Sequence, residues 1–123
     1  MSAAATPSAP RDRVEAYDRL VSAVPEVERK GASMPYTSLN GNMFSYLDAS
    51  GSMALRLSAP DRATFIARYS THLHEAYGTV QKEYVTVPDA LLDDTERALP
   101  WFRSSLEYAA SLKPKPTTRG RTR

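Results

Sequence analysis

His72, His74 and Glu75 form the densest group of side chains in the sequence that could bind a metal ion. Imidazole nitrogens and carboxylate oxygens are ordinary ligands of zinc. If the helix that begins near residue 59 extends this far, however, side chains two positions apart point in different directions. The spacing therefore favours exposed residues at a helix end over a metal site, and we expect neither a metal nor another cofactor.

Nucleophilic catalysis and phosphate binding also lack a specific pattern. Ser, His and Asp are all present, but no Gly-x-Ser-x-Gly turn or comparable local frame accompanies them. The glycines at positions 31, 41, 51 and 78 are isolated, and each is explained by a turn rather than by a phosphate-binding loop. The chain has no cysteine, which excludes disulfides, thiolate metal sites and cysteine nucleophiles. We expect no catalytic residues and a protein that is not an enzyme.

The cationic side chains gather in the last segment of the sequence. Five of them are candidate phosphate contacts: Lys113, Lys115, Arg119, Arg121 and Arg123. The whole chain has a net charge of +2, so without these five charges the remainder carries −3. Polyanions attract clustered Lys and Arg without sequence preference, so weak nucleic-acid binding is one interpretation of this tail. A solubilising disordered segment is the other.

Length and composition predict one globular domain. A chain of 123 residues with 41% hydrophobic residues has room for one core. Residues 1–10 are rich in Ala, Ser, Thr and Pro and predict a disordered leader, 11–112 the domain, and 113–123 a basic disordered tail. The sequence contains neither a signal-peptide pattern nor a segment of membrane-spanning length, so we expect a cytoplasmic protein without membrane contacts.

The elements of this domain are organised around residues 34–57. Asn40-Gly41 between two runs of strand-forming residues predicts a type I′ hairpin, and a turn at residues 49–52 adds a third strand. This register places Thr37 opposite Phe44, Tyr46 opposite Leu55, and Phe44 opposite Leu57. One face then collects the residues Leu39, Phe44, Tyr46, Leu55 and Leu57.

Segments on both sides of this meander supply the helices that cover that face. Apolar spacing predicts a helix from about Pro10 to Val24, and the capping pattern of Ser58 and Asp61 predicts another. Residues 28–33 suggest a short edge strand, 80–87 a long strand, and 89–94 a turn with two leucines facing inward. Pro100 opens or kinks a last helix whose Trp101 shares the core with Phe44, Leu55 and Leu57. The predicted fold class is α+β: an antiparallel sheet with helices mainly on one face.

The opposite face of the meander is the candidate partner site. In the predicted register it carries Tyr36, Ser38, Met43, Ser45 and Arg56. Met and Tyr are adaptable contact residues, and a sheet covered on one side leaves its other face open to a protein partner or a second copy of the chain. A solvated face with scattered apolar residues is the alternative.

Several segments resemble the TfoX N-terminal domain family. They are residues 41–47 in the hairpin, 53–57 before the capped helix, and 87–89 leading through paired acids to 99–101. The resemblance covers about residues 11–112 and implies a stand-alone YjbR-like α+β domain with no established enzymatic activity. This resemblance, together with the lack of a catalytic pattern in the sequence, predicts a protein-interaction or regulatory module. The alternative is a nucleic-acid accessory protein that acts through its basic tail.

Overall fold

The computed structural model describes residues 9–32, 34–76 and 78–115. In this part of the chain, four helices and five strands follow one another in a mixed order. They are α1 (Arg11–Ser22), β1 (Tyr36–Leu39), β2 (Asn42–Leu47), β3 (Met53–Arg56), α2 (Ala59–Tyr69), β4 (Leu73–Ala76), β5 (Thr79–Val87), α3 (Asp89–Asp93) and α4 (Thr95–Ser111).

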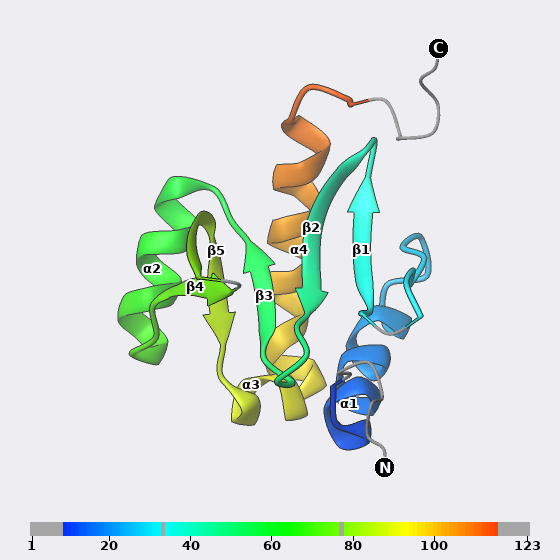
Figure 1. Ribbon diagram of the computed structural model, residues 1–123. Helices are drawn as coiled ribbons and strands as arrows, with labels where there is room; N and C mark the ends of the chain where they lie inside the picture. Colours follow the sequence, from blue (N-terminus) through cyan, green and yellow to red (C-terminus); the bar gives the residue numbers. More distant parts are fainter. Residues whose placement is uncertain (1–8, 33, 77, 116–123) are drawn as a thin grey trace.

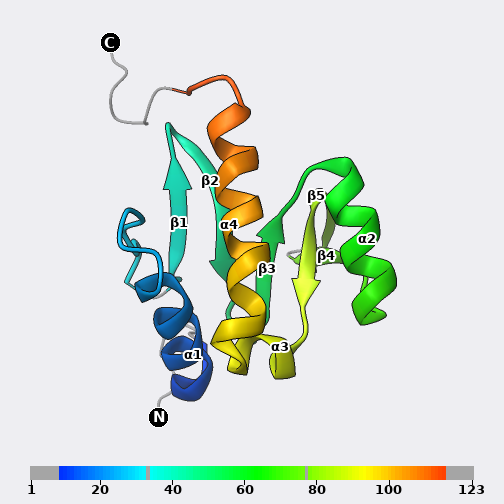
Figure 2. The ribbon, with the colours of Figure 1, turned by 180° about the vertical axis from the view of Figure 1, so that it is seen from behind.

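The strands form one antiparallel sheet in the order β1-β2-β3-β5-β4. Helices α1, α2 and α4 lie on the same side of it, with α4 across the middle (Figures 1 and 2). This arrangement confirms the predicted α+β fold with helices mainly on one face. We call the uncovered side of β1 and β2 the open face.

The predicted type I′ hairpin is confirmed at Asn40 and Gly41. Their φ angles are +54° and +81°, and only these two residues separate β1 from β2. A Cβ atom at position 41 would lie 2.0 Å from the carbonyl oxygen of Lys115, so the turn needs glycine for space as well as for backbone angle. This turn therefore also positions the segment that follows α4.

The register between β1 and β2 differs from the predicted one because β2 contains a bulge. Ser38 pairs with Met43, but Thr37 pairs with Ser45, so Phe44 is an extra residue in β2. The predicted pairing of Thr37 with Phe44 is wrong for this reason. The register between β2 and β3 is also one position from the predicted one, but here the cause is the turn, which spans residues 48–52 and is one residue longer than predicted. Ser45 therefore pairs with Leu55 in place of Tyr46, and the prediction that Phe44 lies opposite Leu57 is wrong as well.

The bulge places Phe44 and Ser45 on the same side of the sheet. The Phe44 ring lies 5.5 Å from that of Phe102 in α4, and the Ser45 hydroxyl lies 2.7 Å from that of Tyr17 in α1. The Ser105 hydroxyl of α4 donates to the Arg56 carbonyl at 2.5 Å and lies 3.2 Å from the Phe44 carbonyl. Tyr46 consequently lies on the side of the sheet opposite Phe44 and Leu55, so its predicted face is wrong, although it is buried as predicted (4% exposed).

The predicted core is otherwise confirmed. Phe44, Leu55 and Leu57 are at most 2% exposed and belong to one apolar cluster. Trp101 is partly buried against this cluster. The terminal helix is therefore the main cover of the sheet, as its apolar residues predict.

Local signals place most helices correctly. The Ser58 side chain accepts a hydrogen bond from the Asp61 backbone N–H, and α2 begins at the next residue after Ser58. The predicted turn at 89–94 contains α3, with Leu91 and Leu92 buried as expected. Asp94 caps α4, which begins five residues before Pro100.

Two edge elements differ from expectation. Residues 28–33 do not form a strand in their described part, where Lys30 makes only an isolated bridge to Tyr36. The unpredicted strand β4 follows α2, because the left-handed conformation of Ser70 (φ +51°) ends the helix. His74 therefore lies on a strand and not on a helix.

Candidate functional site

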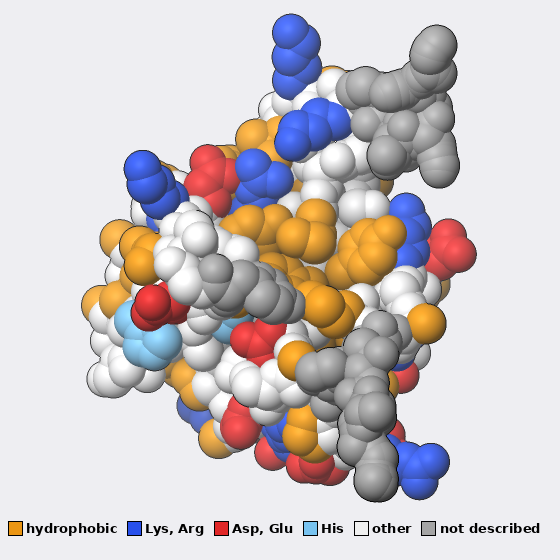
Figure 3. Space-filling model, viewed as in Figure 1, with side chains coloured by type: hydrophobic (Ala, Val, Ile, Leu, Met, Phe, Trp, Pro, Cys, Tyr) orange, Lys and Arg blue, Asp and Glu red, His pale blue; other side chains and the backbone are white. Residues whose placement is uncertain are grey.

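The open face carries an apolar hollow of about 200 Å³. Its walls are Met34, Tyr36, Met43, Tyr46 and Gln81. Figure 3 shows apolar side chains gathered over the middle of this face. The Tyr46 hydroxyl donates to the Gln81 side chain at 2.7 Å, which fixes one wall of the hollow. Of the candidate partner residues, Tyr36 and Met43 line the hollow, and Ser38 pairs with Met43 beside it.

Ser45 does not lie on the open face, which corrects the predicted set. It is 0% exposed and bonded to the hydroxyls of Tyr17 and Thr37 on the helix side of the sheet. Burial raises the pKa of Tyr17, so its hydroxyl remains protonated and can donate. The bulge at Phe44 turns Ser45 inward, where it links α1 to the sheet.

Arg56 is a rim residue of the open face, and two of its guanidinium nitrogens already donate hydrogen bonds. It pairs with Tyr84 in the sheet and donates to Glu83 at 2.7 Å and to the Met43 carbonyl at 3.3 Å. The hydrogen bond from Arg56 holds the pKa of Glu83 below its usual range. The Tyr84 hydroxyl also donates to the Met43 carbonyl, at 2.8 Å. Arg56 thus fixes the backbone behind the hollow.

His74 is buried in a polar cluster that the sequence did not indicate. It is 2% exposed, and its Nε2 lies 3.1 Å from Asp48 Oδ2 while its Nδ1 lies 2.8 Å from Thr86 Oγ1. Burial lowers the pKa of His74 although the Asp48 charge opposes this. The neutral ring then donates from Nε2 to Asp48 and accepts at Nδ1 from Thr86.

The predicted exposure of these histidines at a helix end is therefore wrong for His74. His72 and Glu75 are exposed, and strand alternation separates Glu75 from the buried His74. Across the residues that the structure describes, no three His, Cys, Asp or Glu side chains gather as a metal site would require.

Asp48 organises the turn between β2 and β3. Its Oδ1 accepts hydrogen bonds from Ser50 N at 2.9 Å, Ser50 Oγ at 2.6 Å and Ser52 N at 3.1 Å. Burial disfavours its charge, but these bonds and the neighbouring His74 together hold the pKa of Asp48 below its ordinary value. Asp48 and His74 thus connect the meander turn to the edge strand β4.

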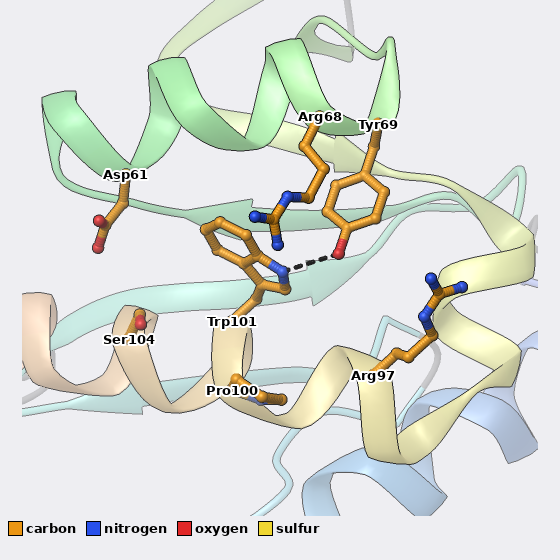
Figure 4. Close-up of a pocket in the computed structure, with 7 residues that line it drawn as sticks. All are labelled: Asp61, Arg68, Tyr69, Arg97, Pro100, Trp101 and Ser104. Atoms are coloured by element: carbon orange, nitrogen blue, oxygen red, sulfur yellow. Dashed lines mark hydrogen bonds between the residues drawn. The ribbon is translucent and has the colours of Figure 1, made fainter.

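A larger cleft of about 760 Å³ lies between α2 and α4 (Figure 4). Its lining residues are Asp61, Arg68, Tyr69, Arg97, Pro100, Trp101 and Ser104. The indole Nε1 of Trp101 donates to the Tyr69 hydroxyl at 3.0 Å. No sequence pattern indicated this cleft, because its residues come from two helices that are separated along the chain by β4 and β5.

The sequence profile of the TfoX N-terminal domain matches residues 21–109, which are 89 of the 123 residues. The chain belongs to the TfoX N-terminal domain family. This match confirms the resemblance drawn from the hairpin and the 87–101 region. It runs from the end of α1 into the last turn of α4, so the family region includes the whole sheet, the open face and the cleft. No curated protein and no solved structure matches the chain significantly.

In this TfoX N-terminal domain protein, the segment after α4 contacts the hairpin turn. The Asn42 side chain donates to the Lys113 carbonyl at 3.1 Å, and the Lys115 backbone N–H donates to the Asn40 carbonyl at 2.8 Å. The side chains of Lys113 and Lys115 therefore begin the basic segment at the tip of the hairpin. The other candidate phosphate contacts, Arg119, Arg121 and Arg123, lie outside the described residues.

None of the helices in the described ranges combines the length and the apolar character that crossing a bilayer demands.

Proposed function

We propose that this TfoX N-terminal domain protein is a non-enzymatic interaction or regulatory module that binds a protein partner at its open face. The hollow of Met34, Tyr36, Met43, Tyr46 and Gln81 carries the proposal. Aromatic residues and Met are enriched at protein interfaces, and Met adapts its shape to a partner. In the described part of the chain, the helices lie on the other side of the sheet.

The polar groups of the sheet support a binding role over a catalytic one. His74 and Asp48 are the natural pair for acid–base chemistry, yet His74 is 2% exposed and both are bonded to each other and to fold-forming groups. A general base must reach a substrate proton within hydrogen-bond distance. A buried pair that connects a turn to a strand does not meet this requirement.

Replacing Met43 by glutamate is expected to abolish partner binding while leaving the fold intact. The change puts a charge into the apolar hollow, whereas the Met43 backbone carbonyl keeps its bonds to Arg56 and Tyr84. The measurement is affinity capture from an extract of the source cells with nuclease present, followed by mass spectrometry. Light scattering of the purified protein tests self-association in parallel.

Val80→Glu is the matched control, because Val80 is apolar and 50% exposed but does not line the hollow. It should capture the same partner as the parent protein, and both variants should melt within a few degrees of the parent. Equal capture by the parent and by Met43→Glu would reject the open face as the binding site.

A second candidate function rests on the five cationic residues at 113–123 and on the −3 charge of the remainder. We expect weak, sequence-independent binding to DNA or RNA at low salt that is largely lost near physiological ionic strength. A truncation after Lys115 should remove most of it while keeping the two hydrogen bonds to the hairpin. Fluorescence anisotropy at two salt concentrations measures this. Salt-resistant binding that survives truncation would instead place a nucleic-acid site on the folded domain.

A further inference from the structure

Two arginine side chains in the cleft between α2 and α4 have no anionic partner among the residues that the structure describes. Arg68 comes from the last turn of α2 and Arg97 from the first turn of α4, and both are exposed. Neither guanidinium group forms an ion pair or a hydrogen bond with a described residue. Four other arginines each pair with a carboxylate: Arg13, Arg29, Arg56 and Arg103. The cleft thus holds two cations whose donors remain available.

An aromatic platform positions one of these cations. The guanidinium carbon of Arg68 lies 5.9 Å from the ring centre of Trp101. Trp101 is held in turn by its hydrogen bond to Tyr69 and by the ring of Phe65, which meets it edge to face at 5.0 Å. A cation–π contact restrains a guanidinium group without using its N–H donors. Arg68 is therefore preorganised to bind an oxyanion.

The cleft has an anionic end as well as a cationic one. Figure 4 shows Asp61 and Ser104 on the side of Trp101 away from Arg97. The Asp61 carboxylate accepts hydrogen bonds and repels an anion, which favours one orientation of a bound molecule. The volume of about 760 Å³ lies within the range of about 300–1,000 Å³ that small-molecule sites occupy.

We propose that this cleft binds a small organic phosphate. The phosphate binds the planar fork of Arg68 beside Trp101, and the organic body extends along Trp101 with its N–H or O–H donors toward Asp61. Arg97, which Figure 4 shows beyond Tyr69, adds a second positive charge to the same cleft. The site is separate from the open face, since the two share no lining residue. Ligand binding here is therefore independent of the proposed partner site and can be tested without the partner.

Adenosine monophosphate is a suitable probe, and Trp101, the single tryptophan of the chain, reports its binding by fluorescence. We expect a saturable fluorescence change with this nucleotide. Adenosine should bind at least about tenfold more weakly because it lacks the charged group. Inorganic phosphate should compete but bind more weakly, because it lacks the body that packs over Trp101.

Arg68→Gln should weaken nucleotide binding by about tenfold, as expected for loss of one charged hydrogen-bond donor group. Arg97→Gln, which removes a charge beyond Tyr69, should weaken binding by less. Because Arg68→Gln also alters the surroundings of Trp101, calorimetry provides the affinity independently of fluorescence. The matched control is Arg19→Gln on α1, an exposed arginine that does not line the cleft, and it should leave the affinity unchanged.

Three outcomes would overturn the assignment. The first is the absence of saturable binding up to about 10 mM nucleotide. The second is adenosine or inorganic phosphate binding as tightly as the nucleotide. The third is an affinity that Arg68→Gln leaves unchanged while this variant keeps the melting temperature of the parent. None of these outcomes bears on the proposed partner site at the open face, because the two sites share no lining residue.

Discussion

Replacing Leu55 by alanine is expected to destabilise the protein by about 2 to 5 kcal/mol. Leu55 is 2% exposed on β3 and belongs to the apolar cluster that α4 covers. Removing its branched end leaves a cavity that the surrounding rings and strands fill only in part. Because small domains are stable by only about 5 to 15 kcal/mol, this one change removes a large share of the total.

Urea denaturation of the parent and the variant measures this loss. The control is Val80→Ala, which truncates an apolar side chain that is 50% exposed and should change stability by about 0.5 kcal/mol or less. A loss for Leu55→Ala as small as that of the control would mean that β3 presents its other face to the helices.

The hairpin was predictable because its signals are local. Asn40-Gly41 tolerates the positive φ angles of a type I′ turn, and Ser58 with Asp61 marks the start of α2 through a bond between near neighbours. Each of these structures depends on residues a few positions apart. Their outcome follows from the sequence without knowledge of the rest of the fold.

The bulge at Phe44 was not predictable in this way. Alternation of apolar and polar residues favours a regular strand. In the structure two consecutive residues face the helices instead: Phe44 contacts the ring of Phe102 on α4, and Ser45 bonds to Tyr17 on α1. The hydroxyl of Ser105, 61 positions away from Phe44, lies between the carbonyls of Phe44 and Arg56 and so joins α4 to both strands. Contacts between distant segments decide the register here, and they moved Tyr46 to the open face.

The candidate sites depend on distant contacts in the same way. Tyr36 and Ser38 stay on the predicted partner face because β1 has no extra residue, and Met43 stays because it lies between the hairpin turn and the bulge. Ser45 leaves this face because it follows the bulge. His74 meets Asp48 only because β4 joins the sheet, and β4 is a short strand without a turn signal strong enough to separate it from α2. The side chains of the α2–α4 cleft meet only in the folded protein.

Lowering the pH from about 7.5 to about 5.5 is expected to destabilise the parent protein more than a His74→Gln variant. Burial lowers the pKa of folded His74, whereas the unfolded chain titrates near pH 6.5. Below about pH 6.5, and down to the folded pKa, the unfolded chain binds a proton that the folded protein does not. Stability therefore falls as the pH falls through this window.

Asp48 contributes in a lower window, so the two groups can be separated. Its folded pKa is depressed, so its contribution is complete above the unfolded value of about 3.9 and is lost as the pH falls through the folded pKa. Between about pH 7.5 and 5.5 Asp48 remains charged in both states. The difference measured in this interval therefore reports on His74.

Urea denaturation of parent, His74→Gln and His72→Gln proteins at both pH values tests this assignment. At the higher pH, His74→Gln should cost about 1 to 3 kcal/mol, because Asp48 and Thr86 lose their buried partner. Its further loss at the lower pH should be smaller than that of the parent. His72→Gln, which changes an exposed histidine two positions away and retains His74, should behave as the parent does. If His74→Gln lost as much stability on acidification as the parent, the neutral His74 donating to Asp48 would not be the source of the pH dependence. A larger loss for the variant than for the parent would mean that His74 is protonated in the native protein.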